Sequence, residues 1–488
     1  MPKTQLPMTG GFYVSRSLPL SNQLCSNLFV HINEGGGLAN EVLFGTPGTE
    51  FLVSSGLTLQ VNRGSFEKER IAYFVNGTTL FRLNQIFSVT GAESFTLDSL
   101  GTIPGEGRVS MAENGSQLCV LVPGGDGFIF DENAGVPFQQ ITDTDFKANG
   151  NPQHVVYIDG FFLFTTDTNK FIISALNNGL AYNALDFGSA EADPDRIIAP
   201  VVLNNVLYIA GAETIEPFRN AAATTGAGFP FVRIEGGVIS TGVFSAFSLV
   251  KTTGIFAFIG GGKTDDPSIY TYNGSSINII STDAIDDLLA PLTETQLSNV
   301  FAWEYSQGGD RFVGFTLPTT TVVYEFKSKR WHERKSFDIV DDLAAEFRWR
   351  ANSVVKAYGR ILIGDNQDGR IGSVDLEVFD EYGQNIISTF SVLPFSNLGN
   401  NIKFPMIELT IESGVGNTDD PDPMISMDRS LDGKTFTPRR ERSMGKVGEF
   451  KKRQIWRRNG NARRFEVFRW TVSAKVKKVF IKLEANIK

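Results

Sequence analysis

The feature that most constrains this chain is a turn signal that returns at a nearly regular spacing. Pairs such as Asn-Gly and Asp-Gly, each followed by a short apolar run, are typical of tight β-hairpins because their turns need positive φ at both central positions. Their second residues are separated by 38, 45, 45, 49, 55 and 50 residues and are Gly77, Gly115, Gly160, Asn205, Gly254, Gly309 and Gly359. These intervals match the roughly 40 to 50 residues of a propeller blade. The sequence predicts a β-propeller of six to eight blades.

The clearest single unit lies at residues 301–334. Residues 301–305 alternate apolar and polar side chains, 306–310 form a turn cluster, and 311–317 give a second strand that Pro318 ends. Two further strands are predicted at 321–326, which is rich in β-branched and aromatic residues, and at 330–334. Four short antiparallel strands in about 35 residues are the content of one blade, and a similar unit begins again at 352–365.

Composition supports an all-β chain of 488 residues. It holds 40 Phe and 49 Gly, a mixture that suits many short strands joined by tight turns. No apolar run approaches the ~18 to 20 residues needed to cross a bilayer, and the first residues lack a signal-peptide core, so we expect a protein made in a cytosol. The two cysteines, Cys25 and Cys119, lie in apolar surroundings and are expected to be buried, reduced thiols.

The net charge of −9 conceals an asymmetry along the chain. Residues 427–488 carry 19 Lys and Arg against 6 Asp and Glu, whereas residues 1–426 carry 26 against 48. An acidic body thus precedes a basic end. Opposite charges in one chain favour contact with an acidic partner or with the acidic body of a neighbouring copy, and solvated surface charge is the alternative.

Breaker residues divide the chain into three predicted parts. Residues 1–40, broken by Pro and Gly, are expected to form an extended arm, 41–395 the propeller, and 396–488 a small basic β-domain. One helix is predicted after the cap signal at 281–283 and before Pro291, and a second is predicted at 338–347. Both would lie on the propeller rim.

Catalytic chemistry has few candidate residues. Trp331-His332-Glu333-Arg334 places His beside Glu, but neighbouring strand residues point to opposite faces, so we interpret this run as a packed blade strand. Only three His occur in the chain, which leaves few members for a triad or a His-based metal site. The sequence predicts no enzyme activity and no catalytic, cofactor-binding or metal-binding residues.

Two acidic turn patterns are interpreted as structural. The Asp-rich turns at 264–267 and 419–422 lack the spaced ligands and terminal Glu of a calcium loop. Residues 430–436, Ser-Leu-Asp-Gly-Lys-Thr-Phe, are similar to the Asp-box turn of sialidase propellers but one residue shorter. Such a box is itself structural, so the pattern indicates a β-turn.

A run of basic and aromatic residues near the end of the chain is the candidate interface. It mixes charge and rings as nucleic-acid surfaces do, yet no nucleic-acid-binding signature accompanies it. Phosphate contact and docking to an acidic protein face both remain open, and the charge asymmetry favours docking. The predicted patch comprises Arg439, Arg440, Lys451, Lys452, Arg453, Trp456, Arg457, Arg458, Arg463 and Arg464.

Several of these segments, in chain order, resemble the packaged-DNA stabilisation or tail-hub (nozzle) proteins of short-tailed bacteriophages. Each motif alone is weak, and their common order along nearly the whole chain is the specific part. The matching segments are 21–30, 44–48, 280–282 with Ile285, 315–318 with Tyr324, 331–334, 358–365 with 369–371, 448–453, 456–458 and Arg463.

The resemblance implies a structural virion protein located in the phage tail and assembled in the host cytoplasm. It implies a ring of six copies below the portal and its adaptor that closes the channel, retains packaged double-stranded DNA and conducts it on ejection without reading its sequence. Tailspikes or fibres and a tail needle would attach to the ring. No cofactor and no membrane-spanning segment are implied.

Two other classes of function remain open from the residues alone. One is a propeller that binds or hydrolyses cell-surface glycans, which would need carboxylates gathered at the central mouth. The other is a free nucleic-acid-binding protein, whose affinity would fall steeply with salt and which would form no ring.

Overall fold

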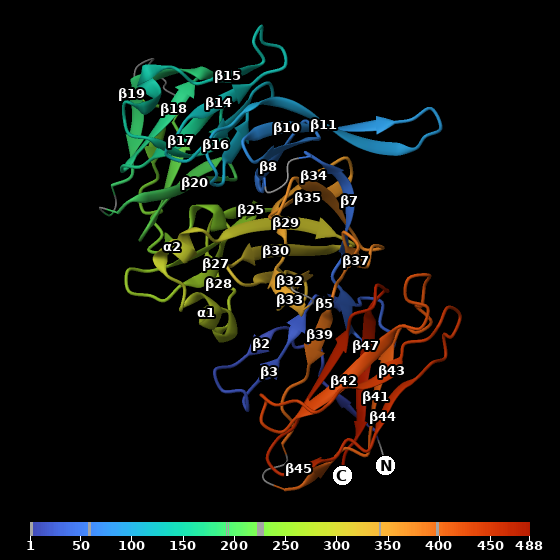
Figure 1. Ribbon diagram of the computed structural model, residues 1–488. Helices are drawn as coiled ribbons and strands as arrows, with labels where there is room; N and C mark the ends of the chain where they lie inside the picture. Colours follow the sequence, from blue (N-terminus) through green and yellow to red (C-terminus); the bar gives the residue numbers. More distant parts are fainter. Residues whose placement is uncertain are drawn as a thin grey trace.

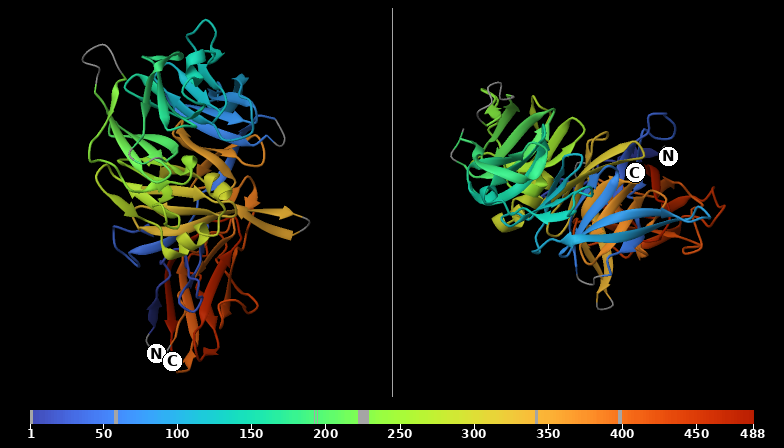
Figure 2. Two further views of the ribbon diagram at one scale, coloured as in Figure 1. Left: turned by 90° about the vertical axis from the view of Figure 1, so that its left-hand side faces the viewer. Right: turned by 90° about the horizontal axis from the view of Figure 1, so that it is seen from above.

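The computed structural model describes residues 3–56, 60–191, 193, 195–221, 229–340, 343–396 and 400–488. Within them the chain forms a β-propeller joined to a β-sandwich, arranged as an elongated molecule (Figures 1 and 2). The pairing of β1 (Thr4–Leu6) with β47 (Val479–Asn486) places both ends of the chain in the sandwich, at the end away from the propeller.

Seven antiparallel sheets form the blades, within the predicted range of six to eight. In each of the first four blades, four strands follow one another in sequence order. They are β8 (Asn62–Lys68), β9 (Ile71–Asn76), β10 (Thr79–Phe87) and β11 (Glu93–Thr102); β12 (Ser110–Glu113), β13 (Leu118–Leu121), β14 (Gly127–Phe130) and β15 (Phe138–Gln140); β16 (Pro152–Ile158), β17 (Phe161–Thr166), β18 (Lys170–Ala175) and β19 (Asn178–Ser189); and β20 (Ile197–Leu203), β21 (Val206–Gly211), β22 (Ile215–Asn220) and β23 (Phe231–Arg233).

The last three blades depart from this plan. The fifth splits its first strand into two pieces, and the sixth continues into a second hairpin. Their strands are β24 (Gly242–Val243), β25 (Val250–Thr252), β26 (Ile255–Gly261), β27 (Ser268–Tyr272) and β28 (Ile277–Ile279); β29 (Phe301–Gln307), β30 (Asp310–Thr316), β31 (Thr321–Glu325), β32 (Arg330–Val340) and β33 (Leu343–Arg348); and β34 (Ala351–Ala357), β35 (Arg360–Asp365) and β36 (Arg370–Asp375).

The ring of blades is closed by a strand from the other end of the chain. The seventh blade takes its fourth strand, β7 (Gly48–Ser54), from the N-terminal region, paired antiparallel with β36. The innermost strand β34 of this blade in turn contacts β8 of the first blade. Closure therefore joins residues more than 300 positions apart, so that unfolding the last blade also opens the ring.

The turn between the first two strands has the same place in every blade, and six of the seven predicted turns occupy it. The remaining predicted turn, Asn76-Gly77, is the second turn of blade one. The equivalent turn there is Glu69-Arg70, which adopts φ of 53° and 68° without a glycine. This substitution explains the short first interval, because Arg70 lies 45 residues before Gly115.

The sandwich has two facing sheets with strands from both ends of the chain. One sheet has the order β44-β41-β47-β6-β5, with β1 added beside β47, and the other contains β4-β39-β46-β42-β43. These strands are β4 (Cys25–Ser26), β5 (Leu28–Ile32), β6 (Glu41–Gly45), β39 (Ser388–Ser391), β41 (Met406–Ile411), β42 (Met424–Ser430), β43 (Arg440–Ser443), β44 (Gln454–Arg457) and β46 (Val467–Val472). Two short pairs are β2 (Tyr13–Val14) with β3 (Asn22–Gln23) and β40 (Ile402–Lys403) with β45 (Asn461–Ala462). Strands β37 (Asp380–Glu381) and β38 (Gln384–Asn385) instead extend the seventh blade, where β37 pairs in parallel with β7.

The predicted arm at residues 1–40 is extended but not free, which corrects the division expected from the sequence. Its strands β1 and β5 lie in one sheet of the sandwich. Strand β4 pairs on one side with β39 of the sandwich and on the other, in parallel, with β32 of the sixth blade. The N-terminal segment therefore joins the propeller and the sandwich into one continuous sheet.

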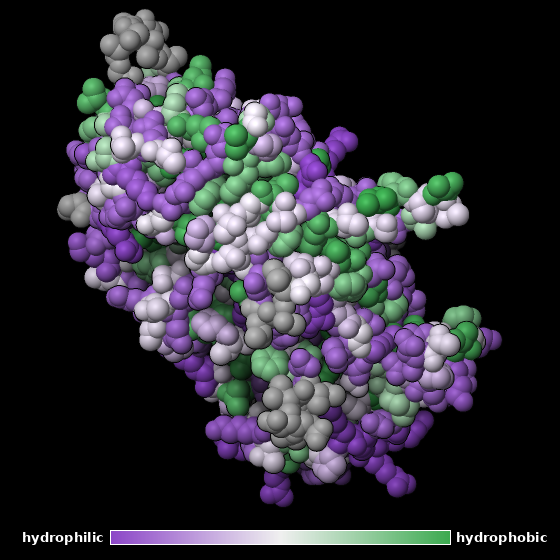
Figure 3. All heavy atoms as spheres, turned by 45° about the horizontal axis from the view of Figure 1, so that its top comes forward, coloured by the Kyte–Doolittle hydropathy of each residue, from purple (hydrophilic) through white to green (hydrophobic). Residues whose placement is uncertain are grey.

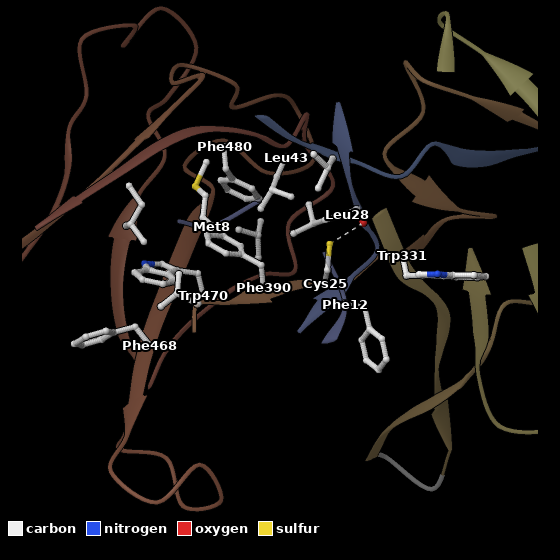
Figure 4. Close-up of a cluster of buried hydrophobic side chains, with 14 of the residues drawn as sticks. Met8, Phe12, Cys25, Leu28, Leu43, Trp331, Phe390, Phe468, Trp470 and Phe480 are labelled. Atoms are coloured by element: carbon white, nitrogen blue, oxygen red, sulfur yellow. Dashed lines mark hydrogen bonds between the residues drawn. The ribbon is translucent and has the colours of Figure 1, made fainter. Parts of the chain in front are cut away.

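A shared hydrophobic core underlies this joint. Figure 4 shows the sandwich side chains Phe390, Trp470 and Phe480 grouped together, with Leu28 and Cys25 of the N-terminal segment between them and Trp331 of the propeller. Phe390 stacks on Trp470 with ring centroids 5.1 Å apart. Because one cluster contains residues of both domains, separating them would expose apolar surface to water.

One predicted helix is confirmed and the other is wrong. Helix α1 (Asp283–Leu289) begins after Thr282 and buries Ile285 and Leu289, and a short α2 (Glu294–Ser298) follows. Residues 338–340 and 343–347 instead lie in β32 and β33, which pair antiparallel, and residues 341 and 342 lie outside the described residues. The spacing of the apolar residues in 338–347 is compatible with a helix. The strand β32 instead continues beyond the blade and pairs with β33, from Lys335 with Arg348 to Val340 with Leu343.

Candidate functional site

The innermost strands of the seven blades surround a central funnel. These strands are β8, β12, β16, β20, β25, β29 and β34, and each contacts the next around the ring. Two adjoining cavities of about 560 and 780 Å³ lie between them and share Phe66, Phe247 and Lys251 in their walls. The wall combines polar groups with apolar side chains, which include Met111, Val250 and Val354.

The funnel is closed at one end by Phe247. This residue belongs to the short 3-10 turn η2 (Ala246–Ser248), which separates the two pieces of the first strand of blade five. Its ring packs edge-on against His154 of blade three, with centroids 4.9 Å apart, and lies 6.0 Å from the Arg108 guanidinium of blade two. A separate cavity containing Arg196 and Asp167 lies beyond Phe247. One side chain therefore spans the axis and separates the funnel from the opposite mouth.

Arg108 lies beside this floor. Its guanidinium carbon is 3.2 Å from the centroid of the Phe301 ring, and its Nη2 donates to the backbone oxygen and Oδ1 of Asn352 at 2.7 and 3.0 Å. Arg348 also donates to Asn352 Oδ1, at 3.0 Å. Burial and the like charge of Arg348 lower the pKa of Arg108 well below its usual range.

The open end of the funnel carries charges of alternating sign. Lys251, Glu304, Lys356 and Glu67 come from blades five, six, seven and one in ring order. Burial raises the pKa of Glu304, while a hydrogen bond from the Thr252 hydroxyl at 3.3 Å opposes this shift. The mouth is thus electrically mixed, with lysine and glutamate side chains alternating around it.

The strand that contains His332 and Glu333 is structural, as predicted. Trp331 is buried and donates to the backbone oxygen of Ile280 at 2.8 Å. His332 lies on the other face between Phe29 and Phe312, and burial lowers its pKa to about 3. A histidine held neutral among aromatic rings is a poor proton-transfer group at physiological pH.

The predicted basic patch lies on and around β43 and β44, and the structure divides its members. Trp456 does not belong to the surface: it is fully buried and donates to the backbone oxygen of Arg440 at 2.8 Å. Arg440 is half-buried and donates to the backbone oxygens of Arg457 and Arg458, so it stabilises the fold locally. The alternation of Trp456 with exposed arginines in a strand explains why its ring points into the core.

The exposed members differ in whether they already have partners. Arg453 holds Glu408 through two hydrogen bonds of 2.7 and 2.8 Å, Lys452 pairs with Glu449, and Arg439 lies 3.8 Å from Asp428. In the part of the chain that the structure describes, the remaining five form no side-chain hydrogen bond or ion pair. They are Lys451, Arg457, Arg458, Arg463 and Arg464.

The Asp-box-like turn at 430–436 is held by its own hydrogen bonds. Asp432 accepts from the backbone N–H groups of Lys434 and Thr435, which lowers its pKa and confirms the Asp-box-like segment as a structural turn. Over the described residues no cluster of three or more His, Cys, Asp or Glu could hold a metal ion. No helix in these ranges is long and apolar enough to cross a membrane.

One apolar contact surface projects from the propeller. The hairpin of β10 and β11 extends beyond the body of the molecule (Figures 1 and 3), and its tip exposes Phe87 and Val89 at 63% and 108% of their reference areas. The composition of the hairpin gave no indication that it would leave its blade.

Comparisons with known proteins give two matches that follow the two domains. The family model described as bacteriophage P22 Gp10, beta-propeller, matches residues 4–379, and that described as bacteriophage P22 Gp10, beta-sandwich, matches residues 390–488. A curated relative, the tail hub protein gp10 of Salmonella phage P22, is 22% identical over 406 residues, which cover 80% of this chain and 83% of the relative.

Solved structures show weaker likeness. The N-terminal domain of Nup159 matches with a TM-score of 0.40 and 12% identity, over 73% of this chain and 99% of that one. The computationally designed Ika8 protein matches with a TM-score of 0.38 and 13% identity, over 67% of this chain and 99% of that one.

Proposed function

This chain belongs to the bacteriophage P22 Gp10 family, and we propose on that basis that it is a structural subunit of a phage tail hub. The observation that carries the proposal is that both family models match, in order, from residue 4 to residue 488. A propeller alone hosts many functions, whereas a propeller followed by this particular sandwich is far more restrictive. The curated relative in Salmonella phage P22 bears the name of a tail hub protein.

A hub that conducts DNA needs a channel, and one subunit does not supply it. Phe247 crosses the propeller axis and contacts His154 at 4.9 Å between ring centroids. A DNA duplex, whose major groove alone is about 12 Å wide, does not fit through this opening. The conduit must therefore lie between copies, which supports a ring; six copies below the portal and its adaptor are the arrangement we propose.

The charge distribution supports a head-to-tail ring. The propeller is acidic and the sandwich basic, and five basic side chains near β44 lack an intramolecular partner among the described residues. In a cyclic assembly each copy offers two different surfaces to its neighbours. We propose that the basic sandwich surface of one copy, including Arg457 and Arg458, contacts the acidic propeller of the next.

The same charges suit a DNA channel lined by propellers. An acidic wall repels the phosphate backbone, so that packaged DNA is retained by closure of the ring and slides through it on ejection without sequence recognition. Tailspikes or fibres and a tail needle would attach to the outside and the end of the ring. In this role the protein is not an enzyme and acts in the virion tail.

The test is assembly of the full-length protein, because the N-terminal strands belong to both domains and neither is expected to fold alone. Native mass spectrometry and negative-stain imaging would be applied to the protein alone and mixed with its portal and adaptor. We expect rings of six in at least one condition. A monomer that ignores the adaptor would refute the hub function.

A charge-reversal pair tests the contact itself. Arg457→Glu with Arg458→Glu should abolish the rings, since both side chains are exposed and unpaired. Arg70→Glu with Arg219→Glu, which changes the same charge on the propeller surface, should leave them intact. If rings still form with Arg457→Glu and Arg458→Glu, this contact is refuted, but the tail-hub function is not. Tight binding of the full chain to duplex DNA at about 0.15 M salt would contradict the sliding channel.

A further inference from the structure

The floor of the propeller funnel contains a cation without a matching anion. Arg108 lines the larger cavity beside Phe247, stacked on Phe301. Within the described ranges, its only hydrogen-bond acceptors are the two oxygens of Asn352, and both bonds come from Nη2. The Nε and Nη1 groups of Arg108 are therefore left for another acceptor.

The neighbouring charges increase this demand. Arg348 shares the Asn352 Oδ1 acceptor, which brings a second positive charge close to Arg108. The carboxylate that acts on Arg348, Asp365, is already bound by Arg350 at 2.5 Å. A buried positive charge is costly unless it is paired, and the lowered pKa of Arg108 reflects that cost.

The space above Arg108 is suited to a ligand. The larger cavity measures about 780 Å³, within the range of roughly 300 to 1,000 Å³ typical of ligand sites. Its wall mixes polar groups with apolar side chains such as Phe66, Val250 and Val354, and its open end carries Lys251 and Lys356 together with Glu67 and Glu304. The arrangement offers apolar surfaces for a ligand body and a guanidinium at the closed end.

We propose that this funnel binds a ligand with an apolar body and a terminal carboxylate, and that the carboxylate pairs with Arg108. Because Nη2 already donates to Asn352 and belongs to both bidentate faces of the guanidinium, the carboxylate would accept a single charge-assisted hydrogen bond from Nε or from Nη1. The apolar body would lie against the wall. Two sources share this chemistry, the C-terminal end of an extended peptide and a fatty acid. The inference is independent of ring formation.

The test uses probes of each source with the full-length protein. Isothermal titration calorimetry would compare N-acetyl-leucyl-leucine as the free acid, the same peptide as its amide, and decanoate. We expect the free acid or decanoate to bind, and the amide to bind at least about tenfold more weakly than the free acid, because only a carboxylate forms charge-assisted hydrogen bonds with Arg108. Binding of the peptide alone assigns a chain end, and binding of decanoate alone assigns a fatty acid.

Matched variants locate the site. Arg108→Gln should weaken binding by about tenfold or more, and Arg108→Lys, which keeps the charge but not the fixed directions of the guanidinium N–H donors, should give an intermediate loss. Arg196→Gln is the control, since Arg196 lies in the cavity on the other side of Phe247. Absence of binding by both carboxylates, equal binding of acid and amide, or unchanged binding by a folded Arg108→Gln variant would overturn the proposal. The wild-type comparison of acid with amide stands even if that variant does not fold.

Discussion

Asn27 is the residue whose replacement best tests how the two domains are joined. It is buried at 1% exposure and adopts a φ of 52°, directly after strand β4. Its Oδ1 accepts from the backbone N–H of Lys335 at 2.9 Å, and its Nδ2 donates to the backbone oxygens of Lys335 and Ile387 at 3.0 and 2.9 Å. One side chain thus bonds a propeller strand and the segment that leads into the sandwich.

The magnitude of the effect of Asn27→Ala follows from these contacts. Three backbone groups would lose a partner, and because the bonds are only partly buried we use the lower end of the cost, roughly 1 kcal/mol each. Alanine in the left-handed region adds about 1 to 2 kcal/mol that asparagine largely avoids. We expect a total loss of about 4 to 5 kcal/mol at the joint.

The assay is amide hydrogen exchange, because a chain of two domains does not support a single free energy of unfolding. The Lys335 amide loses its acceptor, and the three lost hydrogen bonds alone, about 3 kcal/mol of the total, should speed its exchange by at least roughly 150-fold. Asn177→Ala is the control: Asn177 has a φ of 55° in an exposed turn and, over the described residues, no side-chain hydrogen bond. The Asn177→Ala variant therefore measures the free-energy cost of alanine at positive φ without the loss of a side-chain hydrogen bond.

The result that would refute this reasoning is a folded Asn27→Ala protein in which peptides containing Lys335 exchange as in the wild type. Equal effects of Asn27→Ala and Asn177→Ala on the melting temperature would also contradict it, because the hydrogen bonds would then contribute nothing beyond the backbone conformation. Either outcome would mean that the Asn27 side chain does not stabilise the joint, which would then depend on the shared hydrophobic core and the β4 pairings.

Three further predictions concern titration and packing. The pKa of Glu408 is lowered to about 2, chiefly by its hydrogen bonds from Arg453. The ionised carboxylate should therefore stabilise the fold by on the order of 2 kcal/mol above pH 4.5, and this stabilisation should vanish toward pH 2. Glu408→Gln should remove this dependence of the melting temperature on acid pH. Burial lowers the pKa of Lys478 to about 7. Between pH 7 and 10.5 the unfolded chain therefore binds one more proton than the folded chain, and the free energy of unfolding should rise with pH. Lys478→Met should remove this rise, which denaturant melts at several pH values would measure. A Cβ at Gly314 would overlap the Trp303 ring, so Gly314→Ala should cost about 1 to 3 kcal/mol and shift Trp fluorescence, whereas Ala at the open Gly107 should not.

The candidate site could be predicted only in part. The basic character of residues 439–464 was evident from composition, and the exposed arginines follow it. The burial of Trp456 and the backbone contacts of Arg440 were not evident, because they depend on which face of β44 meets the opposite sheet. No local sequence pattern indicated the funnel. Phe247 and Arg108 belong to different blades, and neither is unusual in its own segment.

The sequence by itself determined the all-β class, the repeated four-strand unit and most of the turns, because strand alternation and positive-φ turn residues are local properties. Tertiary structure decided what local patterns do not encode. Strand β7 completes the blade of β36, β4 bridges β32 and β39, and residues 338–340 and 343–347 form paired strands instead of a helix. These choices depend on hydrogen bonds and buried surface supplied by distant strands, and only the closed ring and its joined sandwich bring those strands together.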